Sequence, residues 1–167
     1  MNAQTTKELR QYVLDYFDDK QIKLDDIAYE AYKLQQAYFD DLDVKECWTA
    51  LRNHVLMKRE VLLLAVTGLE LDRFASQHNF KQPLQQIIAS DDGLYGVDEH
   101  IAIGMTEPYG SIATTTYGYL DKIKHGIAKQ LDADSNNEHV NTFIDDIISA
   151  LIADTAAYVA HNHNVVE

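Results

Sequence analysis

The chain has 167 residues and a formal net charge of −13, and 46% of its residues are hydrophobic. This length suits one domain with a sizeable core, and this hydrophobic content excludes a disordered chain. The negative charge argues against a nucleic-acid partner bound through a broad basic face, and against loose attraction to an anionic lipid surface. A phosphate ligand would therefore be received locally, by a few cations or a bound metal.

Apolar residues recur at helical spacing along most of the chain, and only two prolines and seven glycines interrupt it. This pattern predicts an all-α bundle of about six to eight helices. The expected helices cover about 5–18, 25–38, 44–66, 69–78, 83–90, 97–105, 109–124 and 140–160. Tyr38 is expected to face inward, and Gly68 is expected to end the long third helix. The run Thr114-Thr115-Thr116 has β-propensity, but helix is preferred there.

Two polar stretches complete this description. Residues 131–138 are rich in aspartate and asparagine, and they are expected to form a loop before the last helix. Residues 161–167 are expected to fray at the end of the chain. Since no linker or internal repeat is visible, residues 1–167 are expected to form a single domain.

The stretch from Val140 to Ala160 is predicted to be the central helix. One of its faces is an apolar stripe made of Ile144, Ile147, Ile148, Leu151, Thr155 and Val159. The other face carries the small residues Ser149, Ala150, Ala153, Ala157 and Ala160. Because both faces can pack closely, we expect this helix to be buried all round.

Asp145 and Asp146 stand inside this otherwise packable helix. Neighbours in a helix point roughly 100° apart, so Asp145 is expected to flank the apolar stripe and Asp146 to lie among the small residues. Carboxylates in such surroundings must be paired, hydrogen-bonded or bound to a metal. The alternative interpretation is that Asp145 is exposed and that Asp146 caps a helix or forms a salt bridge.

Acids occur in three sets, each on or beside an expected core helix. The sets are Asp98 with Glu99, Asp121 alone, and Asp145 with Asp146. Oxygen ligands without cysteine suit a hard cation such as Mg²⁺, and Mg²⁺ that bridges carboxylates and phosphate oxygens is common in phosphoryl chemistry. Lys122 and Lys124 follow Asp121 closely and could meet a phosphate. Acids at helix starts also serve as caps, which is the structural alternative.

Three segments carry a family resemblance: Val97-Asp98-Glu99-His100-Ile101, Tyr119-Leu120-Asp121-Lys122-Ile123-Lys124 and Phe143-Ile144-Asp145-Asp146-Ile147-Ile148. In this order they resemble the motifs of the phosphatidylglycerophosphatase A family. The segments at 93–99 and 109–115 are similar to those of its soluble, Gram-positive-type branch. The likeness covers roughly residues 90–160.

The resemblance implies magnesium-dependent removal of the phosphate monoester from phosphatidylglycerophosphate, which yields phosphatidylglycerol. It carries metal-binding and catalytic roles to Asp98, Glu99, Asp121, Asp145 and Asp146. It makes Lys124, the motif lysine, the first choice for phosphate binding, and Lys122 is the second. Familiar members are integral membrane proteins, whereas this sequence has no run of ~20 uncharged apolar residues, so we expect no transmembrane segment.

Two other functions are compatible with the acids. A helical nucleotide pyrophosphatase would also use carboxylate-held magnesium, but such enzymes show paired Glu-x-x-Glu helices, which this sequence lacks. A non-catalytic helical homo-oligomer would keep a metal site for stability or regulation. Magnesium-dependent hydrolysis of phosphomonoesters separates the family's phosphatase from the oligomer, and a comparison of lipid phosphate with nucleotide as substrate separates it from the pyrophosphatase.

The sequence also suggests an assembly and a location. Ten tyrosines and the small-residue face of the last helix predict a homodimer or a higher homo-oligomer. The single cysteine, Cys47, excludes an internal disulfide, and residues 1–8 contain no apolar signal region. We therefore expect a cytoplasmic protein that works peripherally at the membrane, where its phospholipid substrate lies.

Overall fold

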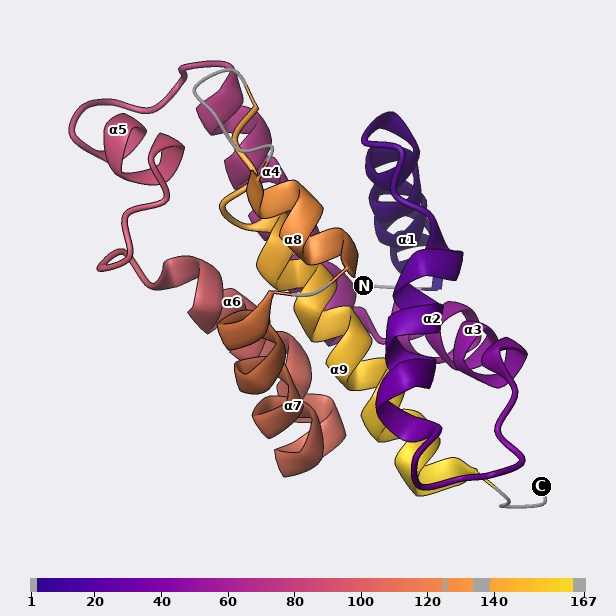
Figure 1. The fold of residues 1–167 in the computed structure, drawn as a ribbon. Helices are drawn as coiled ribbons and strands as arrows, with labels where there is room; N and C mark the ends of the chain where they lie inside the picture. The colour runs from indigo at the N-terminus through magenta and orange to yellow at the C-terminus, as the bar shows by residue number, and fades with distance from the viewer. Residues whose placement is uncertain (1–2, 125, 134–138, 164–167) are drawn as a thin grey trace.

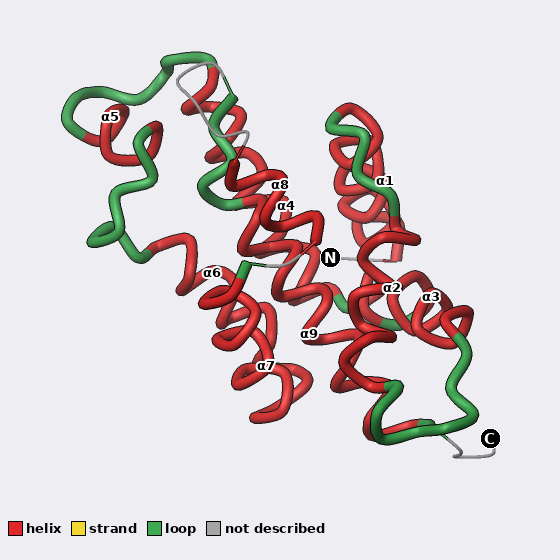
Figure 2. Tube along the Cα trace, in the orientation of Figure 1, coloured by secondary structure: helices red, strands yellow, loops and turns green. Residues whose placement is uncertain are grey.

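The computed structural model of the protein describes residues 3–124, 126–133 and 139–163. Every regular element in these ranges is a helix, and no strand is present among them (Figures 1 and 2). The predicted all-α fold class is therefore confirmed. The elements are α1 Ala3–Asp19, α2 Leu24–Gln35, α3 Val44–Asn53, the 3₁₀ helix η1 Val55–Met57, α4 Arg59–Ser76, α5 Leu84–Ala89, α6 Val97–Thr106, the 3₁₀ helix η2 Glu107–Tyr109, α7 Gly110–Ile123, α8 Gly126–Ala133 and α9 Ile144–Asn162.

The last helix, α9, is the centre of the bundle. It runs through the middle of the molecule in Figure 1 and packs against α2, α3, α6, α7 and α8. All of its residues from Ile144 to Ala157 are buried, on both the apolar stripe and the small-residue face. The prediction of a central helix at 140–160 is confirmed, because a helix that can pack on every side becomes the one that the others surround.

The predicted long helix over 44–66 is wrong, because the chain turns at His54. This residue has φ −123° and ψ −59°, and it separates α3 from η1 and α4. Its ring stacks on Tyr158 of α9 with 4.4 Å between the ring centroids. Val55 and Leu56 follow it fully buried. The apolar pattern continues across the turn, so periodicity alone does not reveal it.

Gly68 does not end a helix, as the sequence predicts, but lies inside α4. A Cβ at this position would come within 2.8 Å of Ile147 Cδ1 and 3.3 Å of Phe143 Cβ. The missing side chain therefore lets α4 approach the start of α9 closely. This contact helps to place α4 against the part of α9 that carries Asp145 and Asp146.

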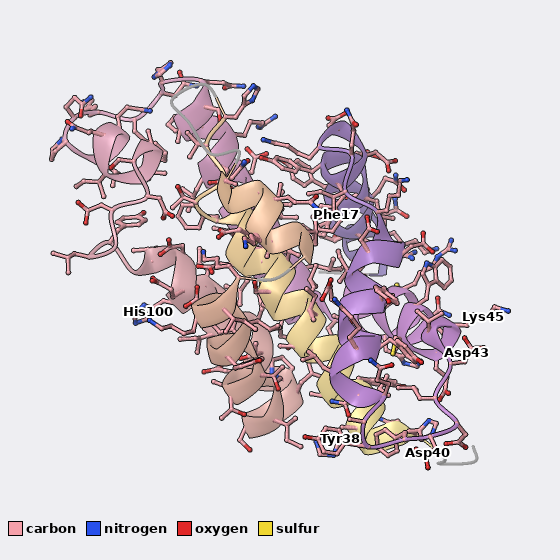
Figure 3. All side chains as sticks on the ribbon, viewed as in Figure 1. Phe17, Tyr38, Asp40, Asp43, Lys45 and His100 are labelled. Atoms are coloured by element: carbon pink, nitrogen blue, oxygen red, sulfur yellow. The ribbon has the colours of Figure 1, made fainter. Side chains whose placement is uncertain are left out.

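Three local expectations are also corrected. α2 ends at Gln35, so Tyr38 lies outside it and is 77% exposed, near the C-terminal end of α9 in Figure 3. The predicted loop at 131–138 begins too early, because α8 extends to Ala133 and buries Ala128 and Leu131. Residues 134–138 lie outside the described part of the chain.

The threonine run lies in helix, as preferred. The hydroxyl groups of Thr114 and Thr115 donate to the carbonyl oxygens of Gly110 and Ser111, at 3.3 Å and 2.8 Å. These bonds satisfy the hydroxyl groups within the helix, which offsets the β-propensity of the run.

The predicted fraying at 161–163 is wrong. α9 continues to Asn162, and the ring nitrogens of His163 lie 2.9 Å from Asp41 Oδ1 and 3.0 Å from Glu46 Oε1. The end of α9 is thereby joined to the loop before α3 and to α3 itself; residues 164–167 lie outside the described residues. None of the helices in the described ranges combines the length and the apolar character that a membrane crossing requires.

Candidate functional site

Three helix ends bring the predicted acids together. Asp98 and Glu99 lie in the first turn of α6, Asp121 lies near the end of α7, and Asp145 and Asp146 lie in the first turn of α9. α6 and α7 both pack against α9, and they pack against each other. The carboxyl groups of Asp98 and Asp121 both act electrostatically on Asp146, so the three sets share one region although they are spread over 49 residues of sequence.

Burial separates these acids into two groups. Asp98, Asp145 and Asp146 are 7%, 2% and 3% exposed, so the alternative of an exposed Asp145 is wrong. Glu99 and Asp121 are half-buried. The site therefore consists of an interior set of carboxylates and a rim that solvent reaches.

Lys124 is the cation of this region. Its ammonium group contacts Asp145 Oδ2, and it lies 3.8 Å from Asp121 Oδ1. Lys122, by contrast, is exposed and makes no ion pair with a described residue. Of the two lysines predicted to bind phosphate, the structure places Lys124 against the acids and leaves Lys122 at the surface.

Burial raises the pKa values of the interior acids. It raises the pKa of Asp145 to about 6, although Lys124 opposes the shift. For Asp146, burial and then the neighbouring carboxylate of Asp145 raise the pKa to about 9, and Asp121 and Asp98 act in the same direction. Each acid therefore makes ionisation of the next more costly, which a bound cation would reverse.

The third interior acid behaves in the same way. Burial, followed by the neighbouring carboxyl of Glu99, raises the pKa of Asp98 to about 7, and Asp91 adds to the shift from the preceding turn. A carboxyl group that titrates near neutral pH can exchange a proton during catalysis. A perturbation of this kind is typical of functional sites, and it also occurs in structural networks.

Several oxygens of the cluster lack a partner. Asp98 Oδ1, Glu99 Oε2 and Asp146 Oδ1 are buried and have no hydrogen-bond partner among the described residues. As they stand, no three histidine, cysteine, aspartate or glutamate side chains in the described ranges are arranged to hold a metal ion. The unpartnered oxygens, all carboxylate, match the ligand type that Mg²⁺ prefers, so the residues fit a magnesium ion by their chemistry.

The structure adds two residues that sequence reasoning missed. Tyr117 lies one helical turn before Asp121, its hydroxyl group is buried, and burial followed by the carboxyl group of Asp146 raises its pKa. Asp72 of α4 is fully buried and accepts hydrogen bonds from the backbone N–H groups of Phe143 and Ile144. The available signal for Asp72 was an acid on the apolar face of a core helix, four residues after Gly68.

Neighbouring polar residues do not all join the site. His100 follows Glu99 on α6, but it is exposed and points away from the bundle in Figure 3. Asp154, two turns after Asp146 on α9, is fully buried, and neither of its carboxylate oxygens has a described partner. Burial raises the pKa of Asp154 without a contribution from the five acids, so Asp154 is a separate buried acid.

The arrangement places carboxylate oxygens, the ligand type of a hard cation, beside a positive charge of the kind that phosphate groups meet. Interior carboxylates supply oxygen ligands, Lys124 supplies a positive charge beside them, and Asp121 and Glu99 form an accessible rim. Such a combination suits the stabilisation of charge on phosphate oxygens.

Comparison with known proteins finds the same family. The sequence model of the family described as Phosphatidylglycerophosphatase A matches residues 37–161, which include all five acids and both lysines. The uncharacterized protein YpjQ of Bacillus subtilis (strain 168) is 39% identical over 163 residues, which cover 98% of this chain and 90% of YpjQ. The uncharacterized protein YutG of the same organism is 43% identical over 143 residues, covering 86% of this chain and 85% of YutG.

Solved structures share the fold. The low temperature requirement C protein from Listeria monocytogenes has 41% identity and a TM-score of 0.87, with 93% of this chain and 96% of that chain covered. The crystal structure of ypjQ has 38% identity and a TM-score of 0.88, with 97% and 99% covered. A protein of unknown function from Bacillus stearothermophilus has 40% identity and a TM-score of 0.85, with 92% and 94% covered.

Proposed function

Because the chain belongs to the phosphatidylglycerophosphatase A family, we propose that it is a metal-dependent phosphatase that acts on phosphatidylglycerophosphate or a related lipid. The observation that carries this proposal is the meeting of three acidic motifs, with Lys124 bound to Asp145, at the ends of α6, α7 and α9. The reaction would break the P–O bond of the phosphate monoester and release phosphatidylglycerol and inorganic phosphate.

Five acids would hold Mg²⁺: Asp98, Glu99, Asp121, Asp145 and Asp146. When bound, Mg²⁺ polarises the phosphate, neutralises its charge and acidifies a coordinated water. This residue set contains no serine or cysteine, so water is the proposed nucleophile. In the metal-free protein the pKa of Asp98 is about 7, so the binding of a cation would favour its ionised form.

Lys124 is proposed to bind the phosphate oxygens. Its ion pair with Asp145 holds the ammonium group beside the interior carboxylates. A bound phosphate would replace part of this contact with Asp145. Lys122, being exposed, is proposed to meet the phosphate from the rim. In this proposal the two lysines orient the phosphate while the interior acids bind the metal.

The proposal also includes an assembly and a location. A homodimer or higher homo-oligomer is proposed from the tyrosine content, and several tyrosines are exposed, including Tyr38 at 77% and Tyr119 at 56%. Work at the cytoplasmic surface of a membrane follows from the proposed lipid substrate. Light scattering at micromolar concentration tests the first point, and co-sedimentation with vesicles tests the second.

The decisive experiment measures phosphate release by the purified protein with Mg²⁺. Phosphatidylglycerophosphate in mixed micelles, a soluble phosphomonoester and a nucleoside triphosphate are compared as substrates. Hydrolysis of the lipid in preference to the others is expected. Hydrolysis of the nucleotide alone would favour the pyrophosphatase, and no hydrolysis together with Mg²⁺ binding would favour the non-catalytic oligomer.

Asp146→Asn tests the site itself. It keeps the size of the side chain but removes a charge that the metal needs, so turnover should fall strongly while the fold is retained. Asp154→Asn is the matched control, because it makes the same change in the same buried helix, two turns away from the cluster. Equal turnover in the two variants would contradict the assignment of Asp146.

A further inference from the structure

The segment that leads into α9 is held by side chains from several parts of the bundle. The backbone N–H of Val140 donates to Ser76 Oγ at 3.1 Å. The side-chain amide of Asn141 donates to the carbonyl oxygen of Leu131 at 3.0 Å, and Lys20 Nζ donates to Asn141 Oδ1 at 3.0 Å. Helices α4 and α8, and Lys20 just after α1, therefore all bind residues that precede the first turn of α9.

The next residues are fixed in the same manner. Thr142 Oγ1 donates to the carbonyl oxygen of Ile88, which belongs to α5, at 2.7 Å. The backbone N–H of Phe143 donates to both carboxylate oxygens of Asp72, at 3.0 Å and 3.2 Å, and the N–H of Ile144 donates to Oδ2 at 2.9 Å. Asp145 and Asp146 are the two residues that follow.

Asp72 differs from an ordinary helix cap. Capping side chains usually belong to the residue at the start of the helix, but the side chain of Phe143, which occupies that position in α9, has no oxygen that could accept a hydrogen bond. The cap comes instead from α4, 71 residues earlier in the chain. One turn before Asp72, Gly68 lets the same face of α4 touch Phe143 and Ile147. The first turn of α9 is thus fixed to α4 by contact and by hydrogen bonds.

This cap is buried at a cost. Asp72 is 0% exposed, and burial raises its pKa, while the bonds from Phe143 and Ile144 and the positive charge of Lys20 oppose the shift. Asp145 acts on the same carboxyl in the unfavourable direction. An acid that is kept in the core next to another acid needs a reason, since a core residue without charge would pack there with less penalty.

We infer that Asp72 is a positioning residue that sets the orientation of the first turn of α9 and thereby holds Asp145 and Asp146 in place for metal binding. A metal site needs its ligands held to within a fraction of an ångström, and side chains that orient the ligands are worth about 10–100-fold in metal affinity or activity. Asp72 touches neither metal nor substrate in this assignment. Its effect passes through the backbone of Phe143 and Ile144. The inference rests on the Mg²⁺ site of the proposed function, but not on the identity of the substrate.

The test compares Asp72→Ala and Asp72→Asn with a control that loses an equivalent buried link. The control is Gln85→Ala: Gln85 is 7% exposed and joins Ala75 and Phe80 through two hydrogen bonds, at 2.8 Å and 3.1 Å, away from the acids. Circular dichroism measures the folded fraction of each protein. Calorimetric titration with Mg²⁺ alone then gives metal affinity, and turnover on the phosphomonoester is measured separately.

We expect Asp72→Ala to weaken Mg²⁺ binding about tenfold or more per folded molecule and to lower kcat more than it raises KM. Asp72→Asn, which retains one acceptor oxygen, should lose less, and it serves as the test if Asp72→Ala does not fold. Gln85→Ala should bind Mg²⁺ like the wild type once the folded fraction is counted.

Two results would overturn the inference. One is equal Mg²⁺ affinity in the wild type and the folded Asp72 variants, and the other is an equal loss in Gln85→Ala. A wild type that binds Mg²⁺ but hydrolyses no phosphomonoester would defeat the proposed function alone, because the affinity measurements would still judge Asp72. A wild type that binds no Mg²⁺ would defeat both.

Discussion

The ammonium group of Lys124 contacts the carboxylate of Asp145, which lies 21 residues later, in the first turn of the central helix. Lys124 is placed for this contact by the end of α7, where it adopts a positive φ of 41° just after the last helical residue. Asp145 is 3% exposed at its side chain, and Lys124 is 28% exposed. The pair therefore joins the interior of the acid cluster to its accessible edge.

Lys124→Ala is predicted to raise KM at least as much as it lowers kcat, because it removes the phosphate-binding charge and leaves the metal ligands in place. It should also raise the pKa of Asp145 further above about 6, since Lys124 now opposes that shift. Steady-state kinetics check the first point. Lys122→Ala, an exposed lysine two residues away, is the control and should change KM less.

The same variant has a pH signature in the metal-free protein. An acid whose folded pKa lies above its unfolded value stabilises most below the unfolded value, and that stability is lost as pH rises through the folded value. Without Lys124 the folded pKa of Asp145 is higher, so the stability that Asp145 contributes should keep falling up to a higher pH than in the wild type. Urea unfolding at pH 5 and pH 8 measures the free energy of unfolding of both proteins. A difference between wild type and Lys124→Ala that is the same at both pH values would contradict an electrostatic interaction between Lys124 and Asp145.

Asp154→Asn is predicted to make the protein relatively more stable as pH rises. Burial raises the pKa of Asp154 well above the unfolded value of about 3.9, so its contribution is complete below about pH 4 and declines above it. Each pH unit at which only the unfolded state ionises costs the wild type about 1.4 kcal/mol. The difference in unfolding free energy between wild type and variant, measured from pH 4 to pH 8, should move steadily in favour of asparagine; a constant difference would show that Asp154 ionises normally.

Gly68→Ala is predicted to destabilise the fold. The added Cβ would meet Ile147 Cδ1 at 2.8 Å and Phe143 at 3.3 Å, and such overpacking costs about 1–3 kcal/mol, which exceeds the helix-propensity gain of about 1 kcal/mol. Gly118→Ala in α7 is the control, because a Cβ there meets nothing within 4 Å. It should stabilise by about 0.5–1 kcal/mol. Thermal unfolding of both variants checks the prediction: the melting temperature should fall for Gly68→Ala and rise for Gly118→Ala.

His163→Gln is predicted to lower the melting temperature more at pH 6 than at pH 9. Hydrogen bonds to Asp41 and Glu46 raise the pKa of His163, so its contribution is complete below the unfolded value of about 6.5 and is lost as pH rises through the folded value. The effect should be small, because Asp41 is 71% exposed and Glu46 is 48% exposed. An equal shift at both pH values would show that the imidazolium charge does not matter.

The all-α fold and the central helix follow from short-range information. The spacing of Ile144, Ile147, Leu151 and their neighbours appears within a few turns, and the absence of strand patterns is equally local. The acids of the site could also be named, because their short motifs occur in the family's order. The local spacing of apolar residues could not reveal the bend at His54 or the close packing at Gly68, because the apolar pattern continues through both positions.

By itself, the sequence determined that the chain is helical, that a helix within 140–160 can pack on every side, and which acids resemble the family's motifs, but it did not reveal α8 or the break between α3 and α4. The tertiary structure alone decided that Lys124 and not Lys122 faces Asp145, that Asp145 is interior, and that Asp72 caps α9 from 71 residues away. Helical periodicity records the direction of a side chain around its own axis. Which helix end lies opposite it depends on how the whole core packs, and no local pattern contains that information.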